Sequence, residues 1–364
     1  MGSWAVDSPY LEPCLTLIRS RTGVSDPGVA VSKLLELDSA IESGSEGDRL
    51  LPFLQRHRLD QLFLRAVREH GLEDMIPRDL HAALVQARRR GAATAMQRQE
   101  VVEVLHRTFV EAGVDYVVFK GSQIAEDLYG EAFLRPSADI DVLVAEKDRR
   151  RAAEALLAAG FEHHPQALGP DYQIAFLGQG TPIDLHWHVM QPERSRRDLT
   201  AWILQGRVES GGRSVPSPEA TLVILLLNPA ITDLASERWI QNLDLDRFLR
   251  AHPSLDWPEV LAVLDRSGLR TAAWTMLQPT LEHLASPLPE DFEAQLAPGF
   301  WRRHWLRAWL RRDPARLYHH WPLPVRLGFA LFLQDRPGDI LRYLRWFLGR
   351  GGRSQDGPPN LDDL

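Results

Sequence analysis

The amino-acid sequence predicts an α+β protein in which a small mixed α/β core lies between two helical regions. Three observations support this class: helical periodicity from Tyr10 to Ala112, a change to short β-rich runs at Val114, and a return of helical periodicity from Ser217. We predict four parts: a helical region 1–112, a core 113–190, a helical region 191–348, and a disordered tail 349–364 with almost no apolar residues.

The first region carries apolar residues spaced three and four apart, as in LLPFLQRHRLDQLFLRAV and EVVEVLHRTFVEAG. This spacing places the apolar side chains on one face of a helix. Gly71 and Pro77 interrupt the pattern, and no β-rich run occurs before Val114. The region is therefore expected to be all-helical.

The core region alternates strand and helix signals. The expected order begins with a strand in DYVVFK, a helix near Ser122 and a second strand in DIDVLV. A helix from Asp148 to Gly160 follows. The last two strands are YQIAFL and PIDLHWHV, paired around the turn Gly178-Gln179-Gly180. About 80 residues are enough for one compact α/β unit.

The third region is helical again, through EATLVILLLNP, RWIQNLDLDRFLRAH and WPEVLAVLDRSG. Its apolar run Ala220–Leu227 is too short to cross a bilayer, and the following Pro229 predicts the end of a helix. We therefore expect no transmembrane segment.

Charge is distributed unevenly along the chain. The formal net charge is −7, yet the segment 301–353 contains twelve Arg against three Asp. In this segment Trp301, Trp305 and Trp309 share one helical stripe, which is interpreted first as Trp packing inward with Arg facing water. The other interpretations are a surface for an acidic protein partner, an anionic membrane surface or nucleic acid.

Cysteine usage and the N-terminus indicate the compartment. Cys14 is the one cysteine, so no internal disulfide can form and a cysteine-based zinc site is excluded. The first residues lack a basic stretch followed by an apolar one, so no secretory signal is expected. A bacterial-type cytoplasm is the predicted location.

Two carboxylates lie in the apolar run DIDVLV. Asp139 and Asp141 are two residues apart and would point to the same side of a strand, while Ile140 and Val142 point to the core. Two carboxylates about 5 Å apart repel by roughly 3 kcal/mol at an effective dielectric constant of 20. Oxygen ligands without a nearby cysteine favour a hard cation, Mg²⁺ with Mn²⁺ as the alternative, bound together with substrate phosphates.

The turn before the first core helix is suited to phosphate. Gly121 allows close approach of the backbone, Ser122 offers a hydroxyl, and a helix N-terminus presents free N–H groups to an anion. Lys120 and Arg135 add positive charge, although a solvated strand end and a structural salt bridge are the alternative interpretations of these two residues.

A third carboxylate appears in PIDLHWHV. Asp184 alternates with Ile183 and Leu185, so its face of the strand could meet Asp139 and Asp141. Three such carboxylates can bind two metal ions, one activating a hydroxyl nucleophile and one stabilising a leaving pyrophosphate. His186 and His188, on the same face as Asp184, are interpreted as polar filling on a half-exposed strand.

The run KGSQIAEDLYGEAFLRPSADIDVLV, followed by LLAAGF and IDLHW, resembles the bacterial uncharacterised nucleotidyltransferase family within the polymerase-β-like nucleotidyltransferase superfamily. The resemblance implies a palm-like mixed sheet. It also implies roles for residues that match the family motifs: Gly121 and Ser122 at the triphosphate, Asp139 and Asp141 as paired metal ligands, Asp184 as the third carboxylate, and Lys120 and Arg135 at recurrent basic positions.

The function implied is transfer of a nucleoside monophosphate from an NTP such as ATP to a hydroxyl-type acceptor, with Mg²⁺ and release of pyrophosphate. The acceptor class stays open between a small molecule, a peptide, a protein and RNA. One alternative is an inactive nucleotide- or partner-binding module, because LLLNPA and NLDLDRF depart from the family pattern in the C-terminal region. Another is a glycosyltransferase with an Asp-x-Asp motif, which about 110 preceding helical residues disfavour.

Overall fold

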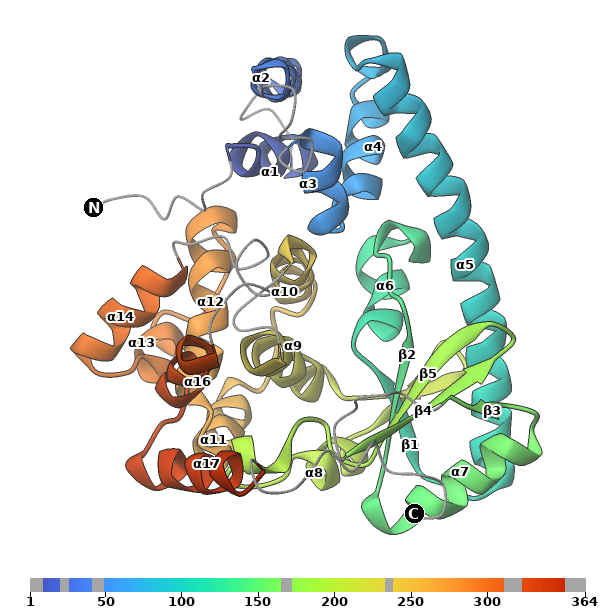
Figure 1. The fold of residues 1–364 in the computed structure, drawn as a ribbon, viewed down its shortest axis with the longest axis vertical. Helices are drawn as coiled ribbons and strands as arrows, with labels where there is room; N and C mark the ends of the chain where they lie inside the picture. The colour runs from blue at the N-terminus through green and yellow to red at the C-terminus, as the bar shows by residue number, and fades with distance from the viewer. Residues whose placement is uncertain are drawn as a thin grey trace.

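A computed structural model describes residues 9–19, 26–40, 49–164, 172–232, 238–310 and 323–350. In Figure 1 the sheet lies at one side of the molecule, the N-terminal helices lie above it, and the C-terminal helices lie on the opposite side. This arrangement confirms the α+β class with a small mixed sheet. Of the tail expected to be disordered, residues 351–364 lie outside the described part, and 349–350 belong to the last helix.

The sheet has five strands: β1 (Tyr116–Phe119), β2 (Ile140–Val144), β3 (Glu162–His163), β4 (Gln173–Gly178) and β5 (Thr181–His186). Their order in space is β1-β2-β5-β4-β3, and β2 with β5 is the parallel pair while the other pairs are antiparallel. The predicted turn joins β4 to β5, and Gln179 and Gly180 both adopt positive φ there, as a tight hairpin requires.

Helices cover both faces of this sheet, which explains why β1 and β2 are buried along their whole length. On one face, α5 (Arg78–Glu111) and α7 (Arg149–Ala158) pack against alternate strand residues such as Val118 and Val142. On the other, α6 (Gly121–Tyr129) and the C-terminal helices pack against Val117, Phe119 and Leu143. The period of two along each strand thus sends side chains into two separate cores.

The N-terminal region is helical, as the periodicity predicted. It contains α1 (Leu11–Arg19), α2 (Pro27–Ser39), α3 (Leu50–Arg56), α4 (Asp60–Glu69), a short 3-10 turn η2 (Glu73–Met75) and the 34-residue α5. Figure 1 shows α5 running from these helices along the edge of the molecule to the sheet. One helix therefore carries residues of the N-terminal arm to the core.

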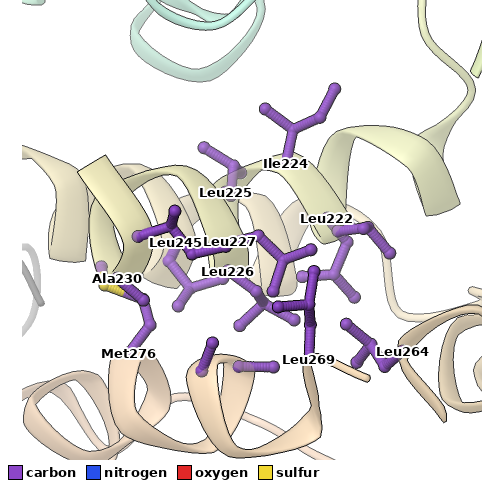
Figure 2. Packing of buried hydrophobic residues seen from close by; sticks show 14 of the residues in the cluster. Leu222, Ile224, Leu225, Leu226, Leu227, Ala230, Leu245, Leu264, Leu269 and Met276 are labelled. Carbon is purple, nitrogen blue, oxygen red and sulfur yellow. The ribbon is translucent and has the colours of Figure 1, made fainter. Parts of the chain in front are cut away.

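The C-terminal region is built around the apolar helix α9 (Pro218–Thr232). Around it lie α8 (Thr200–Gln205), α10 (Trp239–Ala251), α11 (Trp257–Ser267), α12 (Arg270–Leu284), α13 (Phe292–Leu296), α14 (Phe300–Leu310), α16 (Leu323–Phe332) and α17 (Pro337–Arg350). In Figure 2 Leu226 and Leu227 of α9 point toward Leu269 and Met276, while Ile224 points away from them. Short 3-10 turns η3 (Ala132–Leu134), η4 (Glu146–Asp148) and η5 (Pro192–Arg194) complete the connections.

Two local expectations for this region were wrong. Pro229 does not end its helix, because α9 continues to Thr232 with Pro229 buried inside it. The helical region also contains a hairpin of β6 (Val208–Ser210) and β7 (Arg213–Val215). Its turn is Gly211-Gly212, both with positive φ, which glycine adopts without steric cost.

The tryptophan stripe of α14 is only partly buried. Trp309 stacks on Phe329 with ring centroids 4.5 Å apart, and Trp305 stacks on Phe332 at 4.1 Å. Trp301, however, is 81% exposed. Residues 311–322 and 351–353 of the Arg-rich segment lie outside the described part, and an acidic partner or anionic surface for this segment stays a prediction. Among the described residues, no helix combines the length and apolar character needed to span a membrane.

Candidate metal and nucleotide site

The predicted carboxylates lie at the centre of the sheet. Asp141 of β2 and Asp184 of β5 are partners in register on neighbouring parallel strands, so their side chains lie on the same side. His186, two residues after Asp184, shares that face. Ligand atoms of Asp141, Asp184 and His186 all lie within 4.8 Å of one another. Asp184 therefore lies beside Asp141, the second carboxylate of the Asp-x-Asp motif, whereas Asp139 lies one residue before β2 and is not among these three.

Asp141 is the most enclosed of the carboxylates. Its Oδ1 accepts hydrogen bonds from Nζ of Lys120 at 2.8 Å and from Nε2 of His186 at 2.9 Å. Burial alone would raise the pKa of Asp141, but Lys120 and His186 outweigh burial and bring the pKa below its usual value. Asp141 is therefore an ionised carboxylate with two donors on one oxygen.

The other two carboxylates lack such compensation. Burial, and then repulsion from Asp141 and Asp139, raises the pKa of Asp184 to about 7, although Gln173 donates a hydrogen bond to its Oδ2 at 2.9 Å. Burial and Asp141 likewise raise the pKa of Asp139, which accepts a 3.3 Å hydrogen bond from Ser137 Oγ. Two of the three carboxylates are thus held in contact at the cost of a raised pKa, and an oxygen-rich donor set of this kind fits an added divalent cation.

His186 does not match the half-exposed filling expected from the sequence, since it is 1% exposed. Burial, followed by repulsion from Lys120, lowers the pKa of His186 to about 4, so the imidazole is neutral. Its Nε2 donates to Asp141, and within the described residues its Nδ1 has no hydrogen-bond partner. The Nδ1 atom of His188 lies 3.3 Å from Oδ2 of Asp198, away from this group.

Lys120 has an unusual backbone. It precedes α6 with φ 59° and ψ −137°, a conformation that costs a non-glycine residue of order 1–3 kcal/mol. Burial acts to lower the pKa of Lys120, but Asp141 outweighs burial and the pKa is raised. The ammonium is thus bound to the carboxylates rather than solvated, and the strained backbone directs it there.

Gly121 is the first residue of α6, two residues before a helix capped by Ser122 would begin, and Lys120 is at the cap position. A Cβ built on Gly121 would clash with Nη1 of Arg135 and lie 2.8 Å from Oγ of Ser137. The need for glycine therefore comes from these two side chains packing against the turn. The backbone of Ser122 lies in the first turn of α6, while its side chain lies outside the described part of the structure.

Arg135 reaches across to the C-terminal region. Its Nη2 and Nε lie 2.8 and 3.1 Å from Oδ2 of Asp244 in α10, and the hydroxyl of Tyr129 donates to Oδ1 of the same carboxylate at 2.7 Å. Burial acts to lower the pKa of Arg135, but Asp244 outweighs burial and raises it. Two nitrogens of Arg135, Nε and Nη2, thus form the structural salt bridge that was one of the two interpretations of this residue. The third nitrogen, Nη1, lies against the Gly121 turn.

Two further basic residues reach the loop before β2, and no sequence pattern indicated either of them. Nη1 of Arg58 donates to the carbonyl of Pro136 at 3.1 Å, and Nη2 of Arg98 donates to the carbonyl of Ser137. Both residues come from the N-terminal helical region, and Arg98 precedes Ser137 by 39 residues along the chain. An Arg within a helical pattern is usually a surface residue, so periodicity could not single them out.

A family model described as an uncharacterised nucleotidyltransferase matches residues 43–284, more than half of the chain. The chain belongs to this uncharacterised nucleotidyltransferase family. The matched range of this nucleotidyltransferase family member contains the whole sheet, both N-terminal arginines and Asp244, and it ends at the last residue of α12.

Comparison with curated proteins gave no match. Among solved structures, the chain is similar to an antigenic nucleotidyltransferase-like protein from Paracoccidioides brasiliensis, with 16% sequence identity and a TM-score of 0.33. That similarity covers 53% of this chain and 94% of the other.

Proposed function

We propose that the protein is a Mg²⁺-dependent nucleotidyltransferase of the polymerase-β-like superfamily, acting in a bacterial cytoplasm. It transfers a nucleoside monophosphate from an NTP, such as ATP, to a hydroxyl of a small molecule, peptide, protein or RNA, and releases pyrophosphate. The single observation that carries the proposal is the parallel register of Asp141 with Asp184, whose ligand atoms lie close to that of His186. Family membership supports the reaction class.

Asp139, Asp141 and Asp184 would bind the divalent ions, two in number on this proposal, with Mn²⁺ as a possible substitute. Bound there, the metal supplies Lewis-acid stabilisation of charge on the transferring phosphoryl group and the leaving pyrophosphate. This set of carboxylates fits the role because burial and mutual repulsion raise the pKa values of two of them.

The chain's own groups have distinct parts in the reaction. Burial and the neighbouring carboxylates raise the pKa of Asp184 to about 7 before metal binds, and its ionised carboxylate would accept the proton of the acceptor hydroxyl. Lys120, Gly121, Ser122 and the N-terminus of α6 face the β and γ phosphates, since backbone N–H groups at a helix start favour anions. Arg135 places one guanidinium nitrogen at the same turn.

The test is Asp139→Asn, a change that keeps the size of a side chain whose charge the reaction needs. We expect metal-dependent incorporation of labelled NMP to fall by at least 100-fold, the usual order for loss of a group that stabilises the transition state. Asp115→Asn is the matched control, because Asp115 is an exposed acid just before β1 that pairs with Arg207. Equal activity of Asp139→Asn and wild type, with both folded, would refute the proposal.

One observation favours a second candidate, a nucleotide-binding module without catalysis. Nζ of Lys120 already lies 2.8 Å from Oδ1 of Asp141 and supplies a positive charge to this carboxylate. If Lys120 replaces the metal permanently, calorimetry will show NTP binding that is independent of Mg²⁺, and no NTP will give labelled product. Formation of product excludes this candidate.

A further inference from the structure

A cluster of guanidinium groups surrounds Ser137, in the loop that leads into β2. Arg98 donates to the Ser137 carbonyl, Arg58 donates to the carbonyl of Pro136, and Arg135 lies with Ser137 against Gly121. These groups come from three places: the residues after α3, the middle of α5, and the loop itself. The cluster adjoins Asp139, whose pKa Arg58 acts to lower.

Two carboxylates pair with basic groups in this part of the site: Asp244 with Arg135, and Asp141 with Lys120. The carboxylate of Asp139 interacts electrostatically with both Arg58 and Arg98. Burial lowers the pKa of Arg98, and Asp139 compensates only in part, so the charge of this guanidinium is incompletely balanced.

Arg98 also carries unused hydrogen-bonding capacity. It is 7% exposed, and within the described residues its Nε has no hydrogen-bond partner. A buried donor without a partner costs free energy, and a single bond to a carbonyl would need neither the charge nor the planar fork of an arginine. Guanidinium forks match the oxygens of phosphoryl groups in shape and charge.

We propose that Arg58 and Arg98 of the N-terminal helical arm, together with Arg135, form a binding site for phosphoryl oxygens beside Asp139. The assignment rests on the proposed function and extends it, because it makes the helical arm part of the substrate site. The phosphoryl group belongs either to the polyphosphate tail of the nucleotide or to a phosphorylated acceptor.

The test compares Arg58→Asn, Arg98→Gln and the control Arg65→Gln. Arg58 has a φ of 57°, a left-handed conformation that asparagine tolerates better than arginine, so Arg58→Asn removes the charge without adding backbone strain. Arg65 also belongs to the helical arm and donates to a core carbonyl, that of Tyr129 at 3.2 Å, while its Nε donates to Glu69 rather than to the cluster. The Arg65→Gln variant therefore measures the effect of losing a hydrogen bond between the helical arm and the core.

Calorimetry with inorganic tripolyphosphate and Mg²⁺ is the first measurement. We expect the affinity to fall at least tenfold in Arg58→Asn and Arg98→Gln, and to stay within twofold of wild type in Arg65→Gln. The melting temperature of Arg58→Asn should equal or exceed that of wild type, which keeps the test valid if Arg98→Gln folds poorly.

Titration with inorganic phosphate at saturating NTP is the second measurement, and it separates the two sources. A loss confined to tripolyphosphate assigns the cluster to the nucleotide tail, and a loss confined to inorganic phosphate assigns it to the acceptor. Wild-type affinity for both anions in folded Arg58→Asn overturns the inference.

Transfer activity separates this inference from the proposed function. If tripolyphosphate binding depends on the arginines but wild type makes no product, the anion site stands and the proposed function fails. If wild type makes product and both variants keep its KM for NTP and its anion affinities, the proposed function stands and the anion site fails.

Discussion

The buried ion pair between Arg135 and Asp244 joins the core to the C-terminal helices, and Asp244→Asn should weaken the whole fold. Asp244 is 0% exposed and Arg135 is 8% exposed, with nitrogen–oxygen distances of 2.8, 3.1 and 3.3 Å between them. Removing one charge from such a pair leaves the other buried without compensation, which costs about 3–5 kcal/mol.

We expect about 3 kcal/mol for Asp244→Asn, the lower end of that range, because the amide oxygen can still accept from Arg135 and from the Tyr129 hydroxyl. This is a large part of the roughly 5–15 kcal/mol that stabilises an ordinary folded protein. Equilibrium urea unfolding followed by tryptophan fluorescence measures the loss.

Glu69→Gln is the control, since it removes one charge from the exposed pair of Glu69 with Arg65. An exposed pair of this kind contributes only a few tenths of a kcal/mol. The double variant Arg135→Met, Asp244→Leu should recover most of the stability lost in Asp244→Asn, because it leaves no unpaired buried charge. A loss below about 1 kcal/mol in Asp244→Asn, equal to that of the control, would refute this reasoning.

Two further predictions concern titration. The pKa of Asp184 is about 7 in the metal-free protein, so this carboxylate is mostly protonated at pH 6. Mg²⁺ binding at pH 6 should therefore release a proton, which a pH indicator in weak buffer detects. The release should vanish at pH 8.5, and in Asp184→Asn it should be absent at either pH. The pKa of Asp339 is lowered, because Arg196 at 2.6 Å and Arg342 at 3.0 Å outweigh the effect of burial. Asp339→Asn should therefore cost about 1–3 kcal/mol in urea unfolding at pH 7. The difference from wild type should begin to shrink below about pH 4, where the carboxylate of the unfolded chain takes up its proton, and should be lost as the pH falls through the lowered native pKa.

Each of these two titrations has its own refuting result. Equal proton release at pH 6 by wild type and Asp184→Asn would show that Asp184 does not bind the metal. A stability difference between wild type and Asp339→Asn that stays constant from pH 7 to pH 3 would show that the ion pairs with Arg196 and Arg342 are not its source.

Local patterns were sufficient to predict the elements of the core. The period of two in DIDVLV and PIDLHWHV, and the glycine turn between β4 and β5, predicted the strands that carry Asp141 and Asp184. The same alternation predicted that both carboxylates leave their strands on a polar side. These signals are local because backbone geometry alone sets the period of a strand.

Local patterns failed where packing decides the outcome. Pro229 is a helix breaker by propensity, yet α9 continues past it because the buried faces of the C-terminal core outweigh one lost hydrogen bond. The sequence pattern predicted a half-exposed His186. Its side chain is buried next to Phe119 and Asp141 instead, because neighbouring strands and helices cover it.

The sequence by itself determined the class of fold, the strand that carries Asp141, and the approach of Asp184 to Asp141. Tertiary structure alone decided that Arg135 pairs with Asp244, 109 residues away, and that Arg58 and Arg98 reach the loop before β2. The physical reason is that periodicity tells which face of an element is buried, whereas the partner of a long charged side chain depends on how separate elements pack in space.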